Sequence, residues 1–196
     1  MPDDAAPSRK PRADSLRNRD LLLAAAKTAF TESGAEAPLE EIARQAGVGI
    51  GTLYRHFPDR AALMAAVYRR EVEQLTASAE ALLAEMRPAA ALEAWLDQLI
   101  DYMATKRMIA GALQASPGAG AEAYAAGGPA LLDAVTRLGR AAVASGDIRA
   151  DVTAEDLFRL IAGVSYGYDR PDWAPSARRL ISVMMAGLRA DLSSHE

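Results

Sequence analysis

The sequence of 196 residues contains no cysteine and only two histidines, His56 and His195. Without cysteine the chain cannot form a disulfide bond, a thiolate metal site or a cysteine nucleophile. Two histidines so far apart in the chain leave little for a histidine-based metal site or general base. The sequence therefore predicts no metal site, no cofactor and no catalytic site of these kinds.

Aromatic residues are also scarce, at 6% of the chain, and valine and isoleucine are sparse. Alanine, in contrast, accounts for 44 of the 196 residues, and 51% of the chain is apolar. Alanine favours helices, whereas β-branched and aromatic residues favour strands. An apolar fraction this high is also unlike that of a disordered chain. We therefore predict an all-α protein.

Long apolar segments are absent as well. No uncharged apolar run approaches the ~20 residues that a membrane-spanning helix needs. The first ten residues, MPDDAAPSRK, carry charges of both signs and lack the apolar core of a signal peptide. We therefore expect a cytoplasmic protein that makes no contact with membranes.

The net charge of −4 is unevenly distributed along the chain. Residues 1–60 carry nine Lys/Arg and nine Asp/Glu, whereas residues 61–196 carry thirteen and seventeen. A basic cluster near the start comprises Arg9, Lys10, Arg12, Arg17 and Arg19. Such an arm suits a nucleic-acid backbone, although a solvated tail would have the same composition. Because its three prolines disfavour a helix, we expect residues 1–14 to form a flexible basic arm.

The spacing of apolar residues and the positions of Gly and Pro predict about nine helices. We expect them roughly at residues 15–32, 38–46, 50–57, 59–86, 88–105, 106–115, 130–144, from 153 onward, and 174–192. Residues 116–129 are rich in glycine and alanine and are expected to form a loop or a poorly ordered helix. Residues 15–60 then form one domain and residues 61–196 a second.

The most informative segment is PLEEIARQAGVGIGTLYRHFPDRAAL, residues 38–63. Two helices of about eight residues, joined by a turn that contains Gly47, are typical of a helix-turn-helix. Glycine tolerates the positive φ of such a turn, and Leu53 is expected to fill the gap between the two helices. The other face of the third helix carries polar and aromatic residues, which suits the major groove of DNA. An ordinary helical hairpin has the same spacing, with Tyr54 and His56 packed or facing solvent.

The segments RDLLLAAAKTAFTESG and LEEIARQAGVGIGTLYRHFPDRAAL stand in this order and spacing at residues 19–34 and 39–63. They resemble the DNA-binding domain of TetR-family transcriptional regulators, over about residues 15–67. The remainder is similar in helix count and in fragments such as SGDIRADVTAEDL and AGLRADL. The resemblance implies an N-terminal three-helix DNA-binding domain and a C-terminal helical domain for ligand binding and dimerisation. It also implies a repressor that binds a palindromic double-stranded operator as a homodimer and is released by a small lipophilic effector.

The resemblance also implies roles for individual residues near the third helix. Thr52, Tyr54 and His56 match positions that contact DNA, and Arg60 takes the place of a phosphate-binding lysine. Gly49 stands where a capping Ser or Thr is common, so the start of the third helix is expected to be weakly capped. The residues expected to contact DNA are Arg44, Ile50, Gly51, Thr52, Tyr54, Arg55, His56 and Arg60. Ile50 offers only an apolar contact, for example to a thymine methyl group.

Two amphipathic stripes near the C-terminus indicate the dimer interface expected for the family, although both can also face the core of their own chain. They comprise Leu157, Leu160, Ile161 and Val164, and Leu180, Val183, Met184, Gly187 and Leu188. A ligand pocket implied by the family would draw on aromatic and flexible apolar residues of the middle helices. The residues predicted to line it are Trp95, Leu99, Tyr102, Met103, Met108, Tyr124, Phe158 and Tyr166. Taken singly, each is more typical of a helical core.

Two other classes of protein compete with a regulator as interpretations of this sequence. An enzyme would need a nucleophile, base or metal ligands, and residues 61–196 offer only Asp97 and Asp101 at i, i+4, a pair typical of a solvated helix face. An interaction module that has lost DNA binding is favoured by the neutral charge of residues 1–60 and by Ile50. The salt dependence of DNA affinity distinguishes this module from a regulator, because phosphate contacts weaken steeply as salt rises.

Overall fold

The computed structural model describes residues 10–115, 118–165, 170 and 172–189. This part of the chain holds eight helices and no strand, which confirms the all-α prediction. The helices are α1 (Lys10–Ser33), α2 (Leu39–Gln45), α3 (Ile50–His56), α4 (Arg60–Glu85), α5 (Pro88–Ala115), α6 (Ala119–Ala144), α7 (Ala154–Val164) and α8 (Trp173–Leu188).

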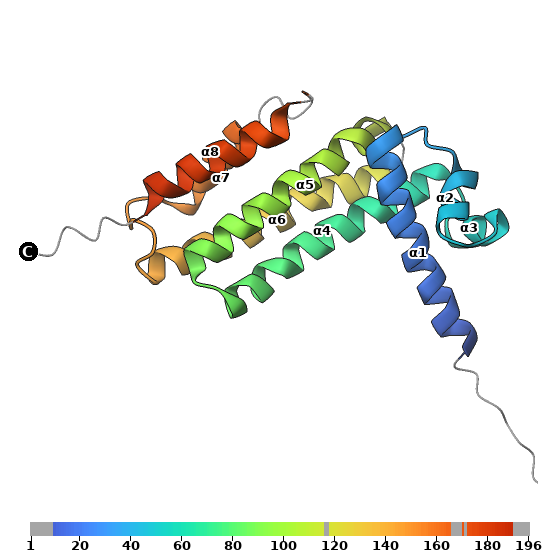
Figure 1. Ribbon diagram of the computed structural model, residues 1–196, viewed down its shortest axis with the longest axis horizontal. Helices are drawn as coiled ribbons and strands as arrows, with labels where there is room; N and C mark the ends of the chain where they lie inside the picture. The colour runs from blue at the N-terminus through green and yellow to red at the C-terminus, as the bar shows by residue number, and fades with distance from the viewer. Residues whose placement is uncertain (1–9, 116–117, 166–169, 171, 190–196) are drawn as a thin grey trace, which may run out of the picture.

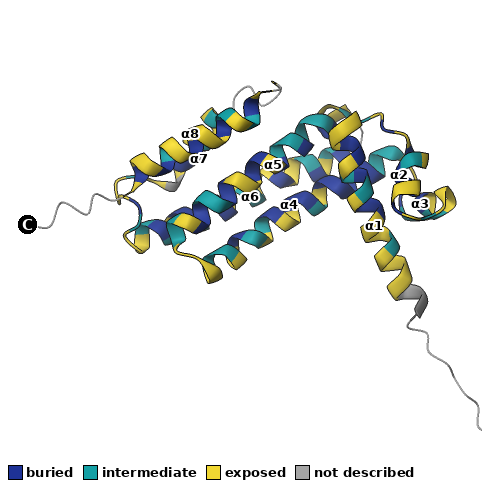
Figure 2. Ribbon diagram, viewed as in Figure 1, coloured by how far each residue is buried: buried dark blue, intermediate teal, exposed yellow. Residues whose placement is uncertain are grey.

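Three long helices form the centre of the molecule. Figure 1 shows α4, α5 and α6 side by side, with α1, α2 and α3 at the end where α4 begins. Helix α8 packs on α5 and α7 packs on α6, so this pair lies on the far side of the bundle from α4. The inner faces of α4, α5 and α6 are buried, and much of α3 is exposed (Figure 2). The architecture therefore separates an N-terminal three-helix head from a larger helical body.

The body has fewer and longer helices than the sequence predicts, which corrects the expected count of nine. Helix α5 runs without a break through residues 105 and 106, because Thr105, Ile109 and Leu113 are buried on the face already used by Leu92 and Trp95. No Gly or Pro interrupts the chain at that point, so nothing local favours two helices over one.

The segment expected to form either a loop or a poorly ordered helix, residues 116–129, belongs for the most part to α6, which starts at Ala119 and contains Pro129. Pro129 lacks the N–H that would bond within the helix, and a proline at such a position normally kinks or breaks it. Here Ala123 is buried before the proline and Val135 after it, in the same core. Tertiary packing on both sides of the proline therefore outweighs the local tendency to break.

The first helix also differs from its predicted start. Helix α1 begins at Lys10 rather than near Ser15, so part of the expected arm is helical. Pro11 falls in the first turn of α1, where a helix does not need the missing N–H. Residues 1–9 of the arm lie outside the described part of the chain.

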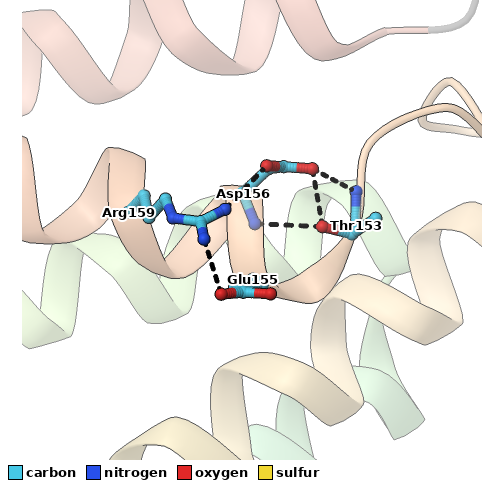
Figure 3. A network of polar contacts seen from close by, with 4 residues as sticks. All are labelled: Thr153, Glu155, Asp156 and Arg159. Atoms are coloured by element: carbon cyan, nitrogen blue, oxygen red, sulfur yellow. Dashed lines mark hydrogen bonds and ion pairs between the residues drawn. The ribbon is translucent and has the colours of Figure 1, made fainter.

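Two predicted helix starts are confirmed in detail. Asp59 caps α4, and its carboxylate accepts a hydrogen bond of 2.7 Å from the backbone N–H of Ala62. Thr153 and Asp156 form a capping box at the start of α7 (Figure 3). The Thr153 hydroxyl accepts from the Asp156 N–H at 3.1 Å, and the Asp156 carboxylate accepts from the Thr153 N–H at 3.0 Å. These hydrogen bonds hold the pKa of Asp156 below its usual value of 3.8.

Candidate nucleic-acid interface and internal cavity

The turn between α2 and α3 has the geometry that the sequence predicts. Gly47 adopts a φ of +70°, and the next N–H, that of Val48, donates to the carbonyl of Ala43 at 3.0 Å. This bond and that from Gly47 to the carbonyl of Arg44 close the end of α2 as a Schellman-type turn. Leu53 is fully buried between the two helices. The turn therefore holds α3 at a defined angle against the rest of the head.

The outer face of α3 is exposed, as the sequence predicts. Tyr54 and Ile50 are large but 47% and 36% exposed, and Arg55 is exposed beside them. Thr52 and His56 are half-buried on the same short helix. A methyl group added at Gly51 would meet nothing within 4 Å, so this face is open. Gly49 precedes α3 without a side-chain cap, as expected.

The inner face of α3 is held against α1 by an interaction that sequence reasoning missed. Phe57 follows α3 and is buried, and the guanidinium of Arg19 lies 5.6 Å from the centre of its ring. The sequence alone assigned Arg19 no role beyond the basic cluster near the start of the chain. The cation–π contact supports the position of α3 from α1, and such contacts are worth roughly 0.5–1 kcal/mol at exposed sites.

Arg44 on α2 is not a simple free cation. Its Nε and Nη2 donate to the carboxylate of Glu41 at 2.7 and 2.5 Å. Gln45 donates to the same carboxylate at 2.9 Å. The hydrogen bonds from Arg44, followed by that from Gln45, lower the pKa of Glu41 to about 2. A DNA phosphate that binds Arg44 would therefore compete with an ionised glutamate.

Arg60, at the start of α4, has a structural role that the sequence did not indicate. Its Nη1 donates to the backbone carbonyls of Ala35 and Ala37 at 2.8 and 2.5 Å. These carbonyls belong to the turn between α1 and α2, so Arg60 ties that turn to α4. Nothing in the sequence between residues 35 and 60 signals this long-range contact.

The head is joined to the body by polar contacts between α1 and α4. Lys27 forms an ion pair of 2.5 Å with Glu71, whose side chain is buried. Nearby, Arg70 donates to the carbonyl of Asp20 at 2.9 Å. These contacts tie α1 to α4, and α1 in turn packs against α3.

The body contains a cavity of about 380 Å³ between α5, α6 and α7, and this cavity is partly open to solvent. Four of the eight residues predicted for a ligand pocket line it: Trp95, Leu99, Tyr102 and Met103. Met108 lies elsewhere, with its methyl group 3.5 Å from where a Cβ of Gly34 would stand. The side chain of Phe158, and Tyr166, lie outside the described part of the chain. The remaining lining residues are Lys106, Gly128, Pro129, Leu131, Leu132, Val135, Ile161, Ala162 and Ser165.

Tyr124, the other predicted residue, belongs to a tyrosine cluster beside the cavity. Its ring stacks on that of Tyr68 at 5.7 Å, and Tyr102 donates a hydrogen bond of 2.8 Å to the Tyr68 hydroxyl. Burial raises the pKa of both Tyr68 and Tyr102, so the two hydroxyls stay protonated. A Cβ at Gly127 would lie 2.4 Å from the Tyr68 oxygen, so only glycine allows this close approach. Sequence reasoning missed Tyr68 because it lies within the buried apolar run 63–68 of α4.

The apolar stripes of α7 and α8 divide between core and surface. Leu157 and Leu188 are buried, and Ile161, Val164 and Met184 are partly buried. Large apolar side chains remain exposed nearby, at 43% for Leu160, 50% for Leu180 and 70% for Val183. A shallow groove of about 540 Å³ runs between Leu160 and Leu180, with Asp156, Arg159, Gly163 and Val164 along it. Arg159 is paired with Glu155 at 2.6 Å and with Asp156 at 3.4 Å (Figure 3).

Asp97 and Asp101 on α5 are both engaged by Arg178 of α8. The distances from the guanidinium nitrogens are 3.9 Å to Asp97 and 2.5 Å to Asp101. All three side chains are exposed, so these acids link two helices at the surface. The geometry agrees with the interpretation of the pair as a solvated helix face.

Comparison with known proteins settles the family. A model described as bacterial regulatory proteins of the tetR family matches residues 22–67. A second model, the C-terminal domain of SbtR-like transcriptional regulators, matches residues 87–190, more than half of the chain. The chain belongs to the TetR family of transcriptional regulators. It is accordingly a regulator with a helix-turn-helix head and not an enzyme.

Solved structures agree with this TetR-family assignment over nearly the whole chain. The TetR transcriptional regulator SCO0520 from Streptomyces coelicolor is 45% identical, with a TM-score of 0.77, over 88% of this chain and 98% of that one. A TetR regulatory protein from Mycobacterium vanbaalenii is 32% identical, with a TM-score of 0.76, over 92% and 99% of the two chains.

Curated relatives match over a shorter span. The HTH-type transcriptional regulator SAR0097 of Staphylococcus aureus is 35% identical over 80 residues, which are 39% of this chain and 41% of that protein. The alignment thus spans about two fifths of this relative's length. No described helix is both long and apolar enough to cross a membrane.

Proposed function

We propose that this TetR-family regulator is a repressor that binds a palindromic operator in the cytoplasm as a homodimer and leaves it when a small lipophilic effector binds. The observation that carries the proposal is the two-sided packing of α3. Leu53 and the adjoining Phe57 are buried, while Ile50, Tyr54 and Arg55 face outward. A short helix that is anchored on one side and open on the other suits insertion into a major groove.

The residues of α3 have different roles in this proposal. Thr52, Tyr54 and His56 contact phosphates and orient α3, and Gly51 allows close approach to the groove. Ile50 packs against thymine methyl groups, and Arg55 supplies a further contact.

Two arginines outside α3 complete the proposed interface. Arg44 reaches a phosphate at the expense of its pairing with Glu41. Arg60 holds the turn between α1 and α2 through Nη1 and offers its remaining N–H groups to a phosphate.

The proposed dimer interface is the exposed apolar face of α7 and α8. Leu160, Leu180 and Val183 lie there at the surface, together with the groove between the two helices. Pairing two chains through this face removes the exposed side chains from water. Two heads related by a two-fold axis can then read half-sites about 34–36 Å apart on one side of the duplex.

The cavity in the body is the proposed effector site. Its volume of about 380 Å³ and mainly apolar lining suit a small lipophilic molecule. Tyr102 lines the cavity and donates to Tyr68 on α4, the helix that begins directly after the head. A ligand that displaces Tyr102 therefore acts on α4, and a coupling of about 1–3 kcal/mol is typical of such allosteric links.

The test of DNA binding starts with selection of fragments from the source genome by the purified protein at two salt concentrations. We expect one palindromic site, bound more weakly as salt rises, because counterion release makes phosphate contacts salt-dependent. Tyr54→Ala and His56→Ala should weaken binding to every sequence alike by about tenfold to a hundredfold, as expected for loss of one hydrogen bond to a charged group. The control is Arg140→Ala, which removes an exposed residue of α6 far from the head. Unchanged affinity in both head variants would contradict the proposed interface.

The second candidate is an interaction module that has lost specific DNA binding. The pairing of Arg44 with Glu41 and the equal numbers of acidic and basic residues in 1–60 favour it. In that case the fragment selection returns nothing above background at either salt concentration. Recovery of one palindromic site whose binding depends steeply on salt rules this candidate out.

A further inference from the structure

The lining of the 380 Å³ cavity is apolar with one charged exception. Among the described residues that form its wall, only Lys106 carries a charge, and no carboxylate is present. The polar groups beside it are the hydroxyls of Tyr102 and Ser165. A purely lipophilic ligand would leave the ammonium group without a counterpart in the cavity.

The surroundings of Lys106 hold its ammonium group near the cavity without neutralising it. The Nζ atom lies 5.0 Å from the centre of the Tyr124 ring and 6.0 Å from that of Tyr102. Aromatic faces attract cations, so the two rings position the charge. No carboxylate in the described ranges lies within ion-pair distance of Lys106.

The acids on neighbouring turns are already engaged by other cations. Asp101, on the preceding turn of α5, is bound by Arg178 at 2.5 Å. Glu71, on the facing helix α4, is paired with Lys27 at 2.5 Å. Within the described ranges, therefore, no side chain acts as a counter-ion to the half-buried ammonium group of Lys106. A partly desolvated cation gains most from an anion placed beside it.

We propose that the effector is an amphipathic anion, an apolar molecule with one carboxylate or similar group that pairs with Lys106. The apolar part fills the space between Trp95, Leu99 and Val135, and the anionic group meets Nζ where the cavity approaches the tyrosine cluster. This inference rests on the proposed function, in which the cavity is the effector site. It adds the class of ligand, which the apolar lining alone does not specify.

The test uses two fluorescent probes that differ by a single anionic group. Anilinonaphthalene sulfonate carries a sulfonate, and phenylnaphthylamine has the same ring system without it. Both are titrated into the full chain and into the variants Lys106→Met and Lys106→Arg. Methionine keeps the length and apolar stem of lysine, and arginine keeps the charge.

We expect Lys106→Met to weaken the sulfonate probe about tenfold or more and to leave phenylnaphthylamine within about twofold, because a hydrogen bond to a charged group is worth ~1.5–3 kcal/mol. Lys106→Arg should retain the affinity for the sulfonate. Ala162→Trp, which places a bulky side chain at the cavity wall, should block both probes. If the Lys106→Met variant retains its affinity for phenylnaphthylamine, the cavity of that variant is intact.

The outcomes separate this inference from the function on which it rests. If both probes bind and Lys106→Met changes neither, or both equally, the anionic effector is wrong and the cavity remains a lipophilic site. If the wild-type chain binds neither probe, or Ala162→Trp blocks neither, the cavity is not a ligand site. That result overturns both this inference and the effector part of the proposed function, while binding to the operator is judged by the fragment selection.

Discussion

The head, α1 to α3, and the body, α4 to α8, are both helical, but the turn that marks the head and the contacts beside the cavity span very different distances along the chain. In the head, the turn closes through residues as near as Ala43 and Val48. In the body, the side chain of Trp95 donates to the carbonyl of Leu75, and Tyr102 donates to Tyr68 on another helix. A function that depends on a local motif can therefore be recognised from the sequence, whereas a cavity between long helices exists only after tertiary assembly.

The strongest test of this contrast removes a buried side chain from the head alone. Leu53→Ala should lower the free energy of unfolding of the head by about 2–5 kcal/mol, because it leaves a cavity where α3 packs on α2. We expect operator binding to be largely lost while phenylnaphthylamine still binds in the body. Thermal unfolding, operator affinity and probe fluorescence measure the three effects.

The matched control for Leu53→Ala is Leu21→Ala, the same substitution at an exposed position of α1. It should change the unfolding free energy by less than about 0.5 kcal/mol. Loss of probe binding in Leu53→Ala would show that head and body unfold as one unit and would remove the contrast.

The next test concerns the surface through which two bodies would pair. Val183→Glu places a charge on the exposed apolar face of α8, where burial in a dimer would be costly. We expect a monomer in sedimentation analysis. Operator affinity should fall about a hundredfold, because the second head no longer binds as part of the same complex.

Ser182→Glu provides the control, since Ser182 lies one residue away on α8, is also exposed and points to a different side of the helix. This variant should remain dimeric. A dimer that persists in Val183→Glu would place the interface elsewhere.

The smallest expected effect concerns the capping box of α7, within the body. Thr153→Ala removes the hydroxyl that accepts from the Asp156 N–H, and loss of such a cap costs ~1 kcal/mol. Thr153→Ser keeps the hydroxyl and should behave like the wild type. Chemical denaturation at pH 7 measures the difference, and equal stability of the Ala and Ser variants would contradict the role of the cap.

The same site predicts a pH dependence with a defined sign. The pKa of Asp156 is lowered in the folded chain, chiefly by the hydrogen bonds from Thr153, so its contribution is complete above the usual value of 3.8. This contribution to stability is lost as the pH falls from 3.8 through the lowered pKa of Asp156. Over that range the unfolded state binds a proton at Asp156 more readily than the folded state does. The difference between wild type and Thr153→Ala should therefore narrow as the pH drops below about 4.

The sequence predicted the head closely and the body only in outline. The positive φ of Gly47, the burial of Leu53 and the open face of α3 all follow from local rules. The predicted break in α5 was wrong. For residues 116–129, predicted as either a loop or a poorly ordered helix, most of the segment is helical. In both places the local signals were weak or pointed to a break, and packing against α4 decided the outcome.

Individual site residues show the same division. Trp95, Leu99, Tyr102 and Met103 were predicted for the cavity because aromatic and flexible side chains are typical of pockets. The sequence does not show which of the predicted residues line the same cavity. Met108, on the same helix, faces the head instead.

The sequence by itself determined the helical class, the helix-turn-helix and the family, because helix propensity, glycine turns and side-chain spacing act over a few residues. Only the tertiary structure decided that Arg60 binds backbone carbonyls of another turn and that Tyr68 receives the hydroxyl of Tyr102. It also decided that Lys106 is the one charged residue among the described residues that line an apolar cavity. These contacts join residues far apart in the chain, and their partners are set by how long helices pack rather than by any local pattern.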